Sequence, residues 1–278
     1  MPELPEVEVV RRDLEHEVVG RKIKTVEVDG VRSVRRHAKG PAFAACLVDR
    51  RITGVARRGK YLVCGLDNAD ALVVHLGMSG QLLRVRSARE PRHRHTHVVV
   101  TFTQGGQLRF VDPRTFGEMF VTPTDAAGWV IELAHLGPDP LDAVHSWEQF
   151  GARLAARTTK LKPLLMDQRF LAGLGNIYSD EILWAAGLRW DRSGDSVRDP
   201  EVRRLARAIT ETLQEAVKCR GSSLADEQYV DLFGRPGGFQ RFHNVYAREG
   251  LACPRCRHVI VRERVGGRST FWCPACQT

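Results

Sequence analysis

The chain has 278 residues, of which 43% are hydrophobic and 27% are charged. This composition is typical of a globular protein with packed cores and excludes an intrinsically disordered chain, while the length favours two domains over one. The 42 Lys and Arg residues outnumber 33 Asp and Glu, and the formal charge of +9 favours a polyanionic partner without proving one. The start MPELPEVEVV lacks the basic stretch of a signal peptide, and no segment has the length of a membrane span, so we expect a cytoplasmic protein.

The first half of the chain combines one helix with a series of short strands. A helix is predicted over residues 5–17, because proline stands in its first turn, Glu6 and Glu8 complement its positive end, and apolar residues recur at helical spacing. Eight short runs rich in β-branched residues come next, separated by Gly, Asp, Asn or Pro. They cover residues 23–28, 52–57, 61–66, 71–76, 81–85, 97–102, 107–111 and 118–121. This pattern is typical of a β-sandwich or barrel.

The second half of the chain has a different periodicity. The strand pattern stops near Pro123, and LGPDPLD at 136–142 is typical of a connection into another domain. Helical spacing is found over 147–156, 179–186 and 200–217, and the last of these helices has an apolar face. The chain is therefore predicted to be an α+β protein.

Four of the seven cysteines form a metal-ligand pattern. They are Cys253, Cys256, Cys273 and Cys276, spaced C-x2-C-x16-C-x2-C. Two short knuckles joined by a hairpin can place four thiolates tetrahedrally around one Zn²⁺, and this closed shell leaves no open position for catalysis, so the metal is predicted to be structural. The isolated Cys46, Cys64 and Cys219 are predicted to be buried free thiols, because the odd number of cysteines argues against a disulfide framework.

Between the cysteine pairs, residues 258–265 and 269–272 are predicted to form two strands around a Gly266-Gly267-Arg268 turn. Taken alone, Arg268 would be a solvated turn residue. At the tip of a zinc-braced hairpin in a basic protein, it is also well placed to contact phosphate.

The N-terminus allows two interpretations. Glu3 and Glu6 can simply complement the dipole of the following helix. Alternatively, removal of Met1 would expose the secondary amine of Pro2 beside Glu3, and an α-amino group with a pKa near 8 is partly unprotonated and nucleophilic at neutral pH. Such an amine can attack C1′ of a sugar and form an iminium.

Six motifs, in order over essentially the whole chain, resemble the formamidopyrimidine-DNA glycosylases of the Fpg/Nei family. They are PELPEVE at 2–8, RRGKYL at 57–62, HLGMSG at 75–80, DPRTFG at 112–117, GLGNIYSDE at 173–181 and GRSTFWCPACQ at 267–277. The resemblance implies an N-terminal β-sandwich with flanking helices over 1–128, a helical DNA-binding domain with a helix-two-turn-helix over 129–247, and a four-cysteine zinc-finger hairpin over 248–278. It also implies a monomer that acts on double-stranded DNA containing damaged bases in the bacterial, nucleoid-associated cytoplasm.

The same resemblance assigns catalytic roles. Pro2 matches the Schiff-base nucleophile, Glu3 the acid that assists opening of the deoxyribose ring, and Lys60 the proton donor of β-elimination. Arg268 matches the donor of δ-elimination and a contact to the lesion phosphate. On the residues alone, Lys60 is only a polar residue at the start of a strand.

DNA-contacting roles come from the resemblance as well. His95, Arg114, Arg157 and Asn176 match phosphate or backbone contacts, and Met78, Arg114 and Phe116 match the residues that fill the gap left by an extruded nucleotide. Judged alone, Met78 and Phe116 would be core residues. Residues 232–246 match a loop over the flipped purine. Many relatives have a second arginine where this chain has Thr115.

The expected function is excision of 8-oxoguanine and formamidopyrimidines from duplex DNA, followed by strand cutting through β,δ-elimination. One alternative is an endonuclease VIII-like enzyme for oxidised pyrimidines, which the PELPEVE start and the Met78, Arg114, Phe116 set disfavour. A paralogue for alkylated or bulky guanines is another. A non-catalytic lesion-binding protein is the third, and the retained Pro2, Glu3, Lys60 and Arg268 argue against it.

Overall fold

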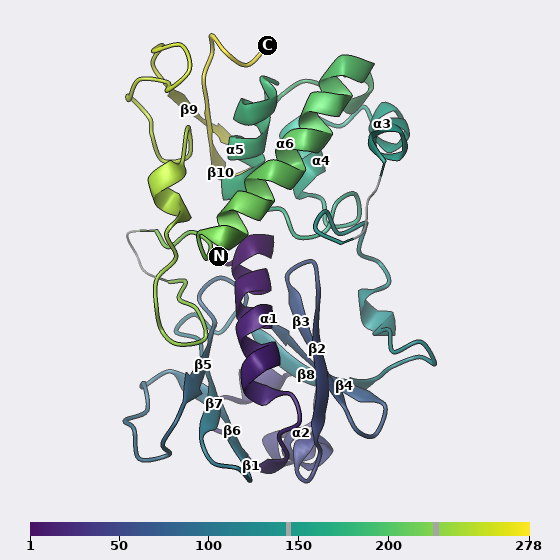
Figure 1. Ribbon diagram of the computed structural model, residues 1–278, viewed down its shortest axis with the longest axis vertical. Coiled ribbons are helices and arrows are strands. Elements are labelled where there is room, and N and C mark those ends of the chain that lie inside the picture. The colour runs from purple at the N-terminus through teal and green to yellow at the C-terminus, as the bar shows by residue number, and fades with distance from the viewer. Residues whose placement is uncertain (143–145, 225–227) are drawn as a thin grey trace. The chain divides into compact units, whose positions relative to one another are not determined.

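The computed structural model describes residues 1–142, 146–224 and 228–278, which divide into two compact units (Figure 1). The first unit comprises Met1–His135 and Cys219–Gly238, and the second comprises Leu136–Lys218 and Phe239–Thr278. Each unit has its own secondary structure. The finer division at residues 128 and 247 stays a prediction.

The first unit contains two four-stranded antiparallel sheets, with strand orders β1-β6-β7-β5 and β2-β3-β4-β8. The strands are β1 Ile23–Val28, β2 Ile52–Arg58, β3 Tyr61–Leu66, β4 Asp70–His75, β5 Gln81–Val85, β6 Thr96–Phe102, β7 Gln107–Val111 and β8 Glu118–Pro123. All eight lie within two residues of their predicted bounds. Apolar residues from strands of both sheets form one buried core, and this confirms the predicted β-sandwich.

Two helices pack on this core. Helix α1 (Leu4–Val18) places Val7 and Leu14, both fully buried, among the strand residues and lies beside β2 (Figure 1). Helix α2 (Gly40–Leu47) was not expected from the sequence. Its eight residues include buried Phe43 and Leu47, but a segment of two turns is too short to show a helical period clearly. Short 3₁₀ turns occur at η1 (Val31–Val34) and η2 (Ile131–Leu133).

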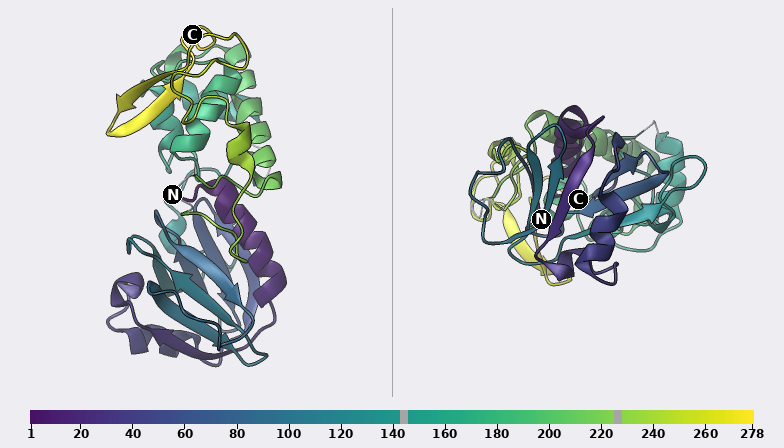
Figure 2. Two further views of the ribbon diagram at one scale, coloured as in Figure 1. Left: turned by 90° about the vertical axis from the view of Figure 1, so that its left-hand side faces the viewer. Right: turned by 90° about the horizontal axis from the view of Figure 1, so that it is seen from below.

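The second unit is helical with one hairpin. Its elements are α3 Trp147–Ala155, α4 Leu161–Met166, α5 Asn176–Ala186, η3 Gly194–Ser196, α6 Asp199–Lys218, η4 Phe239–Phe242, β9 Val261–Val265 and β10 Arg268–Trp272. Helix α6 buries the apolar face that the sequence predicted, and it packs on α5. The six-residue α4 was missed for the same reason as α2. Strands β9 and β10 form an antiparallel pair, drawn in yellow tones in Figure 2.

The isolated cysteines differ from expectation. Cys64 is fully buried, as predicted, but Cys46 and Cys219 are only partly buried, so the prediction was wrong for these two. Cys46 lies on the outer part of a helix whose buried face is supplied by Phe43 and Leu47. Among the described residues, no helix is both long and apolar enough to cross a membrane.

Candidate active site and nucleic-acid interface

The start of α1 is fixed by acidic side chains. Glu3 and Glu6 form a capping box, in which the Glu3 N–H donates to Glu6 Oε2 at 2.9 Å. The other oxygen of Glu6 accepts the Ser222 N–H at 2.7 Å. Gly221 has φ of +77° and lies so close that an added Cβ would stand 2.7 Å from Glu6, so glycine is required there. These contacts hold the backbone beside Pro2 in one position.

Burial distinguishes this cap from an ordinary surface helix start. Glu3 and Glu6 are 2% and 1% exposed, Pro2 is buried, and Met1 is exposed. The structure therefore confirms that these acids cap the helix, and the role of Pro2 as nucleophile stays a prediction.

Lys60 lies in the tight turn between β2 and β3. Arg58 and Tyr61 are register partners, so the turn consists of Gly59, with φ of +56°, and Lys60. Lys60 is buried, with 8% of the residue exposed. Burial, followed by the charge of Lys60, lowers the pKa of His75 to about 4, so this imidazole is neutral at physiological pH. Arg57 is buried and paired with Glu8, although an arginine judged by its type alone would be expected in solvent.

Met78 and Phe116 lie on two adjoining loops. They are 36% and 44% exposed, which excludes the core position that each residue alone would suggest. An added Cβ on Gly77 would stand 2.5 Å from the backbone of Gly117, so the loops are in close contact. The guanidinium of Arg114 lies 5.2 Å from the centre of the Phe116 ring. The structure therefore brings the predicted wedge residues together.

Asp112 organises this pair of loops. Its carboxylate accepts the Ser79 hydroxyl at 2.6 Å and the Gly117 N–H at 2.7 Å, and its own N–H donates to the His95 carbonyl at 3.0 Å. Half-buried His95 is thus tied to the same structure. Thr115 adopts a left-handed backbone with φ of +55°, which disfavours a β-branched residue.

In the second unit, the four predicted metal ligands gather in one place. The sulfur atoms of Cys253, Cys256, Cys273 and Cys276 all lie within 4.8 Å of one another. The separations Cys253–Cys276 and Cys256–Cys273 are 3.8 and 3.5 Å. Tetrahedral zinc–sulfur bonds of about 2.3 Å place sulfur atoms about 3.8 Å apart, so the group fits one Zn²⁺ and is much wider than a disulfide.

Hydrogen bonds favour the thiolate form of Cys253. Burial raises the pKa of Cys253, but the backbone N–H groups of Cys256 and Arg255 and the Trp184 indole lower it to about 6. The Trp184 Nε1 atom is 3.3 Å from the Cys253 sulfur. Such donors around a metal-bound sulfur help to fix its orientation.

Arg268 is exposed at the start of β10, directly after two glycines with positive φ. The strand behind it is firmly attached to the helices. Asn176, at the start of α5, donates from Nδ2 to the Ser269 carbonyl at 3.0 Å, and the Phe271 N–H donates to Asp180 at 2.9 Å. Asn176 and the Arg268 strand therefore lie together, and the second N–H of the amide can serve another acceptor.

A buried ion pair lies beneath this strand. Lys162 Nζ is 2.7 Å from Asp180 and 2.9 Å from the Thr270 hydroxyl. Burial raises the pKa of Asp180 to about 7, against the opposing effect of Lys162. Arg157 is exposed just after α3, and no described contact links it to Asn176.

Comparisons with known proteins cover almost the whole chain. Residues 1–119 match the family described as formamidopyrimidine-DNA glycosylase N-terminal domain, 136–228 match the formamidopyrimidine-DNA glycosylase H2TH domain, and 250–278 match the zinc finger found in FPG and IleRS. The formamidopyrimidine-DNA glycosylase of Heliobacterium modesticaldum is 46% identical, with 100% of both chains covered. The chain belongs to the formamidopyrimidine-DNA glycosylase family.

Solved structures of the family agree over the same length. Lactococcus lactis Fpg in complex with abasic-site DNA has a TM-score of 0.90 at 35% identity, with 99% of each chain covered. A variant of that protein in complex with Fapy-dG-containing DNA has a TM-score of 0.91 at 35% identity, with 100% of each chain covered. These findings confirm the predicted α+β fold, the family and the structural zinc site. The enzyme is a bifunctional DNA glycosylase and AP lyase that removes oxidised purines in base excision repair.

Two buried ion pairs were missed in the sequence, Glu8–Arg57 and Lys162–Asp180. Each member stands within two residues of another charged residue, so no local pattern marks it as buried. The partner of each charge depends on tertiary structure and could not be chosen from the sequence.

Proposed function

We propose that Pro2, once Met1 is removed, is the nucleophile of this glycosylase. Its nitrogen lone pair attacks C1′ of the damaged nucleotide, and the bond to the base breaks with its electron pair leaving on the base. Glu3 gives a proton to the ring oxygen as the sugar opens, and loss of the amine proton leaves an iminium. The observation that supports this proposal is the buried capping box, which fixes the backbone beside Pro2 and includes Glu3, the next residue of the chain.

Strand cutting follows from the same iminium. It acidifies C2′, and loss of that proton expels the 3′ phosphate with help from Lys60. A second elimination expels the 5′ phosphate with help from Arg268. Because arginine is essentially always protonated, Arg268 is better suited to stabilise a departing phosphate than to accept a proton. Hydrolysis of the remaining iminium then frees Pro2.

The remaining residues are proposed to hold the DNA. Exposed Met78 and Phe116, with Arg114 over the ring, suit insertion into the gap left by an extruded nucleotide. His95, Arg157 and the second N–H of Asn176 suit phosphate contacts, and residues 232–246 are proposed to cover the flipped purine. The proposed partner is double-stranded DNA with damaged bases. The enzyme is proposed to bind it as a monomer in the nucleoid-associated cytoplasm.

Borohydride trapping on matched duplexes tests this proposal. We expect a covalent adduct and β,δ-elimination products on an 8-oxoguanine duplex, and much slower reaction on a duplex containing an oxidised pyrimidine. Absence of an adduct while the strand is cut would contradict the iminium. Faster reaction on the oxidised pyrimidine would contradict the proposed lesion preference.

A further inference from the structure

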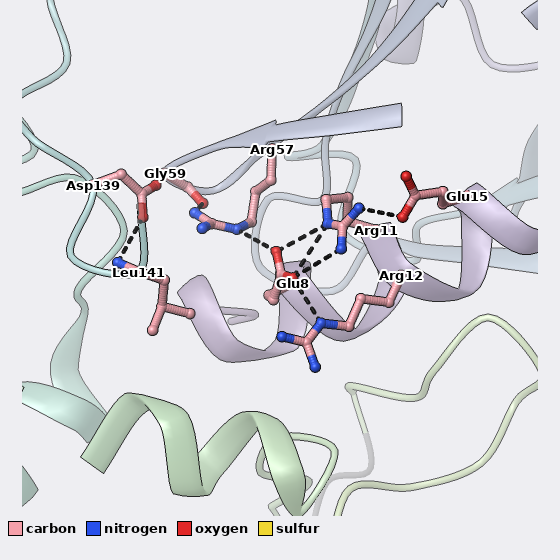
Figure 3. Close-up of polar contacts among 8 residues, drawn as sticks. All are labelled: Glu8, Arg11, Arg12, Glu15, Arg57, Gly59, Asp139 and Leu141. Carbon is pink, nitrogen blue, oxygen red and sulfur yellow. Dashed lines mark hydrogen bonds and ion pairs between the residues drawn. The ribbon is translucent and has the colours of Figure 1, made fainter. Parts of the chain in front are cut away.

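A buried ion pair joins the helix that follows Pro2 to the turn that carries Lys60. Glu8 lies on α1, and Arg57 lies on β2, three residues before Lys60. Arg57 Nε donates to Glu8 Oε2 at 2.9 Å, and its Nη1 donates to the Gly59 carbonyl at 3.1 Å (Figure 3). One planar guanidinium therefore connects a carboxylate of the helix to the backbone of the turn.

This connection is buried and strongly bonded. The side chains of Arg57 and Glu8 are 3% and 10% exposed. Glu8 also accepts hydrogen bonds from Arg12 at 2.8 Å and from Arg11 at 3.1 Å (Figure 3). Burial raises the pKa of Glu8, but the hydrogen bonds from the three arginines lower it below its ordinary value. Charges this deeply buried persist where their geometry is held by several bonds.

The Gly59 carbonyl is the atom through which this pair acts on Lys60. That carbonyl belongs to the peptide group that joins Gly59 to Lys60, and Gly59 has the left-handed φ of +56°. In a two-residue turn, the orientation of this peptide group sets the direction in which the next side chain leaves the backbone. A bond from a buried, fixed guanidinium therefore restricts where Lys60 can point.

We propose that Glu8 and Arg57 are positioning residues for the lyase step, because they fix the Lys60 turn relative to the helix behind Pro2. The inference rests on the roles proposed for Pro2 and Lys60. Those two groups act in succession on one sugar, so the distance between them must be kept. A displacement of about 1 Å can reduce the rate of a positioned reaction about 100-fold. Neither Glu8 nor Arg57 needs to touch DNA.

Arg57→Lys tests this role with little change in charge. Lysine can still pair with Glu8, but a single ammonium lacks the planar fork that reaches both Glu8 and Gly59. In single turnovers at saturating enzyme on preformed abasic-site DNA, we expect strand cleavage to slow about 10- to 100-fold. The yield of the borohydride-trapped adduct should stay within about two-fold, since the Glu3–Glu6 cap beside Pro2 is untouched.

Arg12→Lys is the matched control. Arg12 donates to the same carboxylate from a side chain that is 57% exposed, and its described hydrogen bond goes to Glu8 and not to the turn. Both readouts should match the unaltered enzyme. A second variant, Glu8→Asp, keeps the charge but shortens the carboxylate, and should slow cleavage selectively by several-fold even if Arg57→Lys fails to fold.

Three outcomes would overturn the inference. Cleavage by Arg57→Lys and Glu8→Asp at the rate of Arg12→Lys would show that the pair does not position Lys60. Equal losses of trapping and cleavage, in step with a lower melting temperature, would show a purely structural role. Unchanged cleavage by Lys60→Ala would contradict the proposed role of Lys60, and this inference with it. If Lys60→Ala cleaves slowly while Arg57→Lys and Glu8→Asp cleave at the normal rate, Lys60 keeps its proposed role and only this inference fails.

Discussion

The corner made by α1 and the β2–β3 turn differs sharply from the β9–β10 hairpin, although both carry groups proposed to act on the same sugar. In the corner, Glu3, Glu6, Arg57 and Lys60 are all less than 10% exposed. On the hairpin, Arg268 is exposed and follows two glycines with positive φ. A two-stranded hairpin is marginally stable alone, so it depends on metal and on the helices beneath it.

This difference indicates that the groups proposed for sugar chemistry and the group proposed for phosphate contact need different structural surroundings. A nucleophile and a proton donor must be held in place before reaction, and the sandwich core provides this. A guanidinium that contacts a flexible DNA backbone must be able to adjust its position, so an exposed side chain suits it better than a buried one. The four cysteines and the Lys162–Asp180 pair fix the base of the hairpin and leave its tip exposed.

Removal of the metal should have the largest effect, and it should affect the hairpin but not the corner. Cys253→Ser is expected to lower zinc content and DNA affinity together, by about 10-fold or more, because the hairpin loses its order. Thermal unfolding of the sandwich should change little. Metal analysis and binding titrations check this, with Cys46→Ser as the matched control for loss of a thiol. A zinc-free variant with full DNA affinity would contradict the claim that the hairpin depends on the metal.

Loss of the Arg268 guanidinium should affect a later step than loss of Lys60. On preformed abasic-site DNA at saturating enzyme, Arg268→Ala should accumulate the β-elimination product, with an unsaturated aldehyde at the 3′ end, at the expense of the δ-product. Denaturing gels give the ratio. Arg264→Ala on the neighbouring strand is the control, and an unaltered ratio in Arg268→Ala would reduce Arg268 to a phosphate anchor.

His75, which lies on β4 opposite Tyr61, should make stability depend on pH. His75 has an ordinary pKa of 6.5 that falls to about 4 in the folded protein, so the unfolded chain takes up the proton first on acidification. The stability that depends on neutral His75 is complete above about pH 6.5. It declines between the two pKa values and is lost as the pH falls through about 4. At about 1.4 kcal/mol per pKa unit, the loss is about 3 kcal/mol.

Denaturant unfolding from pH 7 to 4 measures this dependence. His75→Gln should flatten the decline, whereas His135→Gln, at an exposed position, should leave it unchanged. An equally steep decline in His75→Gln would show that other groups dominate.

The smallest expected effect concerns exposed Arg157. If it neutralises one phosphate, Arg157→Ala should make the slope of log K against log salt shallower by about 0.9. Arg207→Ala removes an exposed arginine that is paired with Glu211 and should leave the slope unchanged. The same slope in both variants would remove Arg157 from the DNA contacts.

Much of the fold was accessible from sequence because short β-branched runs separated by turn residues mark the strands, and all eight were found within two residues. Helices α2 and α4 were missed because eight and six residues hardly show a period. The zinc ligands followed from spacing. The position of Pro2 after Met1 left two interpretations open, and the family resemblance favoured the nucleophile. Lys60 came only from the family resemblance, since a single lysine at a turn carries no chemistry of its own.

What sequence could not supply were pairings between distant residues. Arg57 resembles any surface arginine until Glu8, 49 residues away, is placed beside it. Met78 and Phe116 looked like core residues because apolar side chains are usually buried, and only the loop geometry shows them exposed.

The central claim, that the buried start of α1 presents Pro2 as the nucleophile, is tested most directly by mapping the borohydride-trapped adduct. The enzyme is trapped on an 8-oxoguanine duplex, digested, and the DNA-linked peptide is sequenced by mass spectrometry. We expect the DNA on the amine of a peptide that begins at Pro2, and no adduct from a protein with an uncleaved N-terminal extension. DNA linked to a lysine-containing internal peptide, or full trapping by the extended protein, would contradict the account.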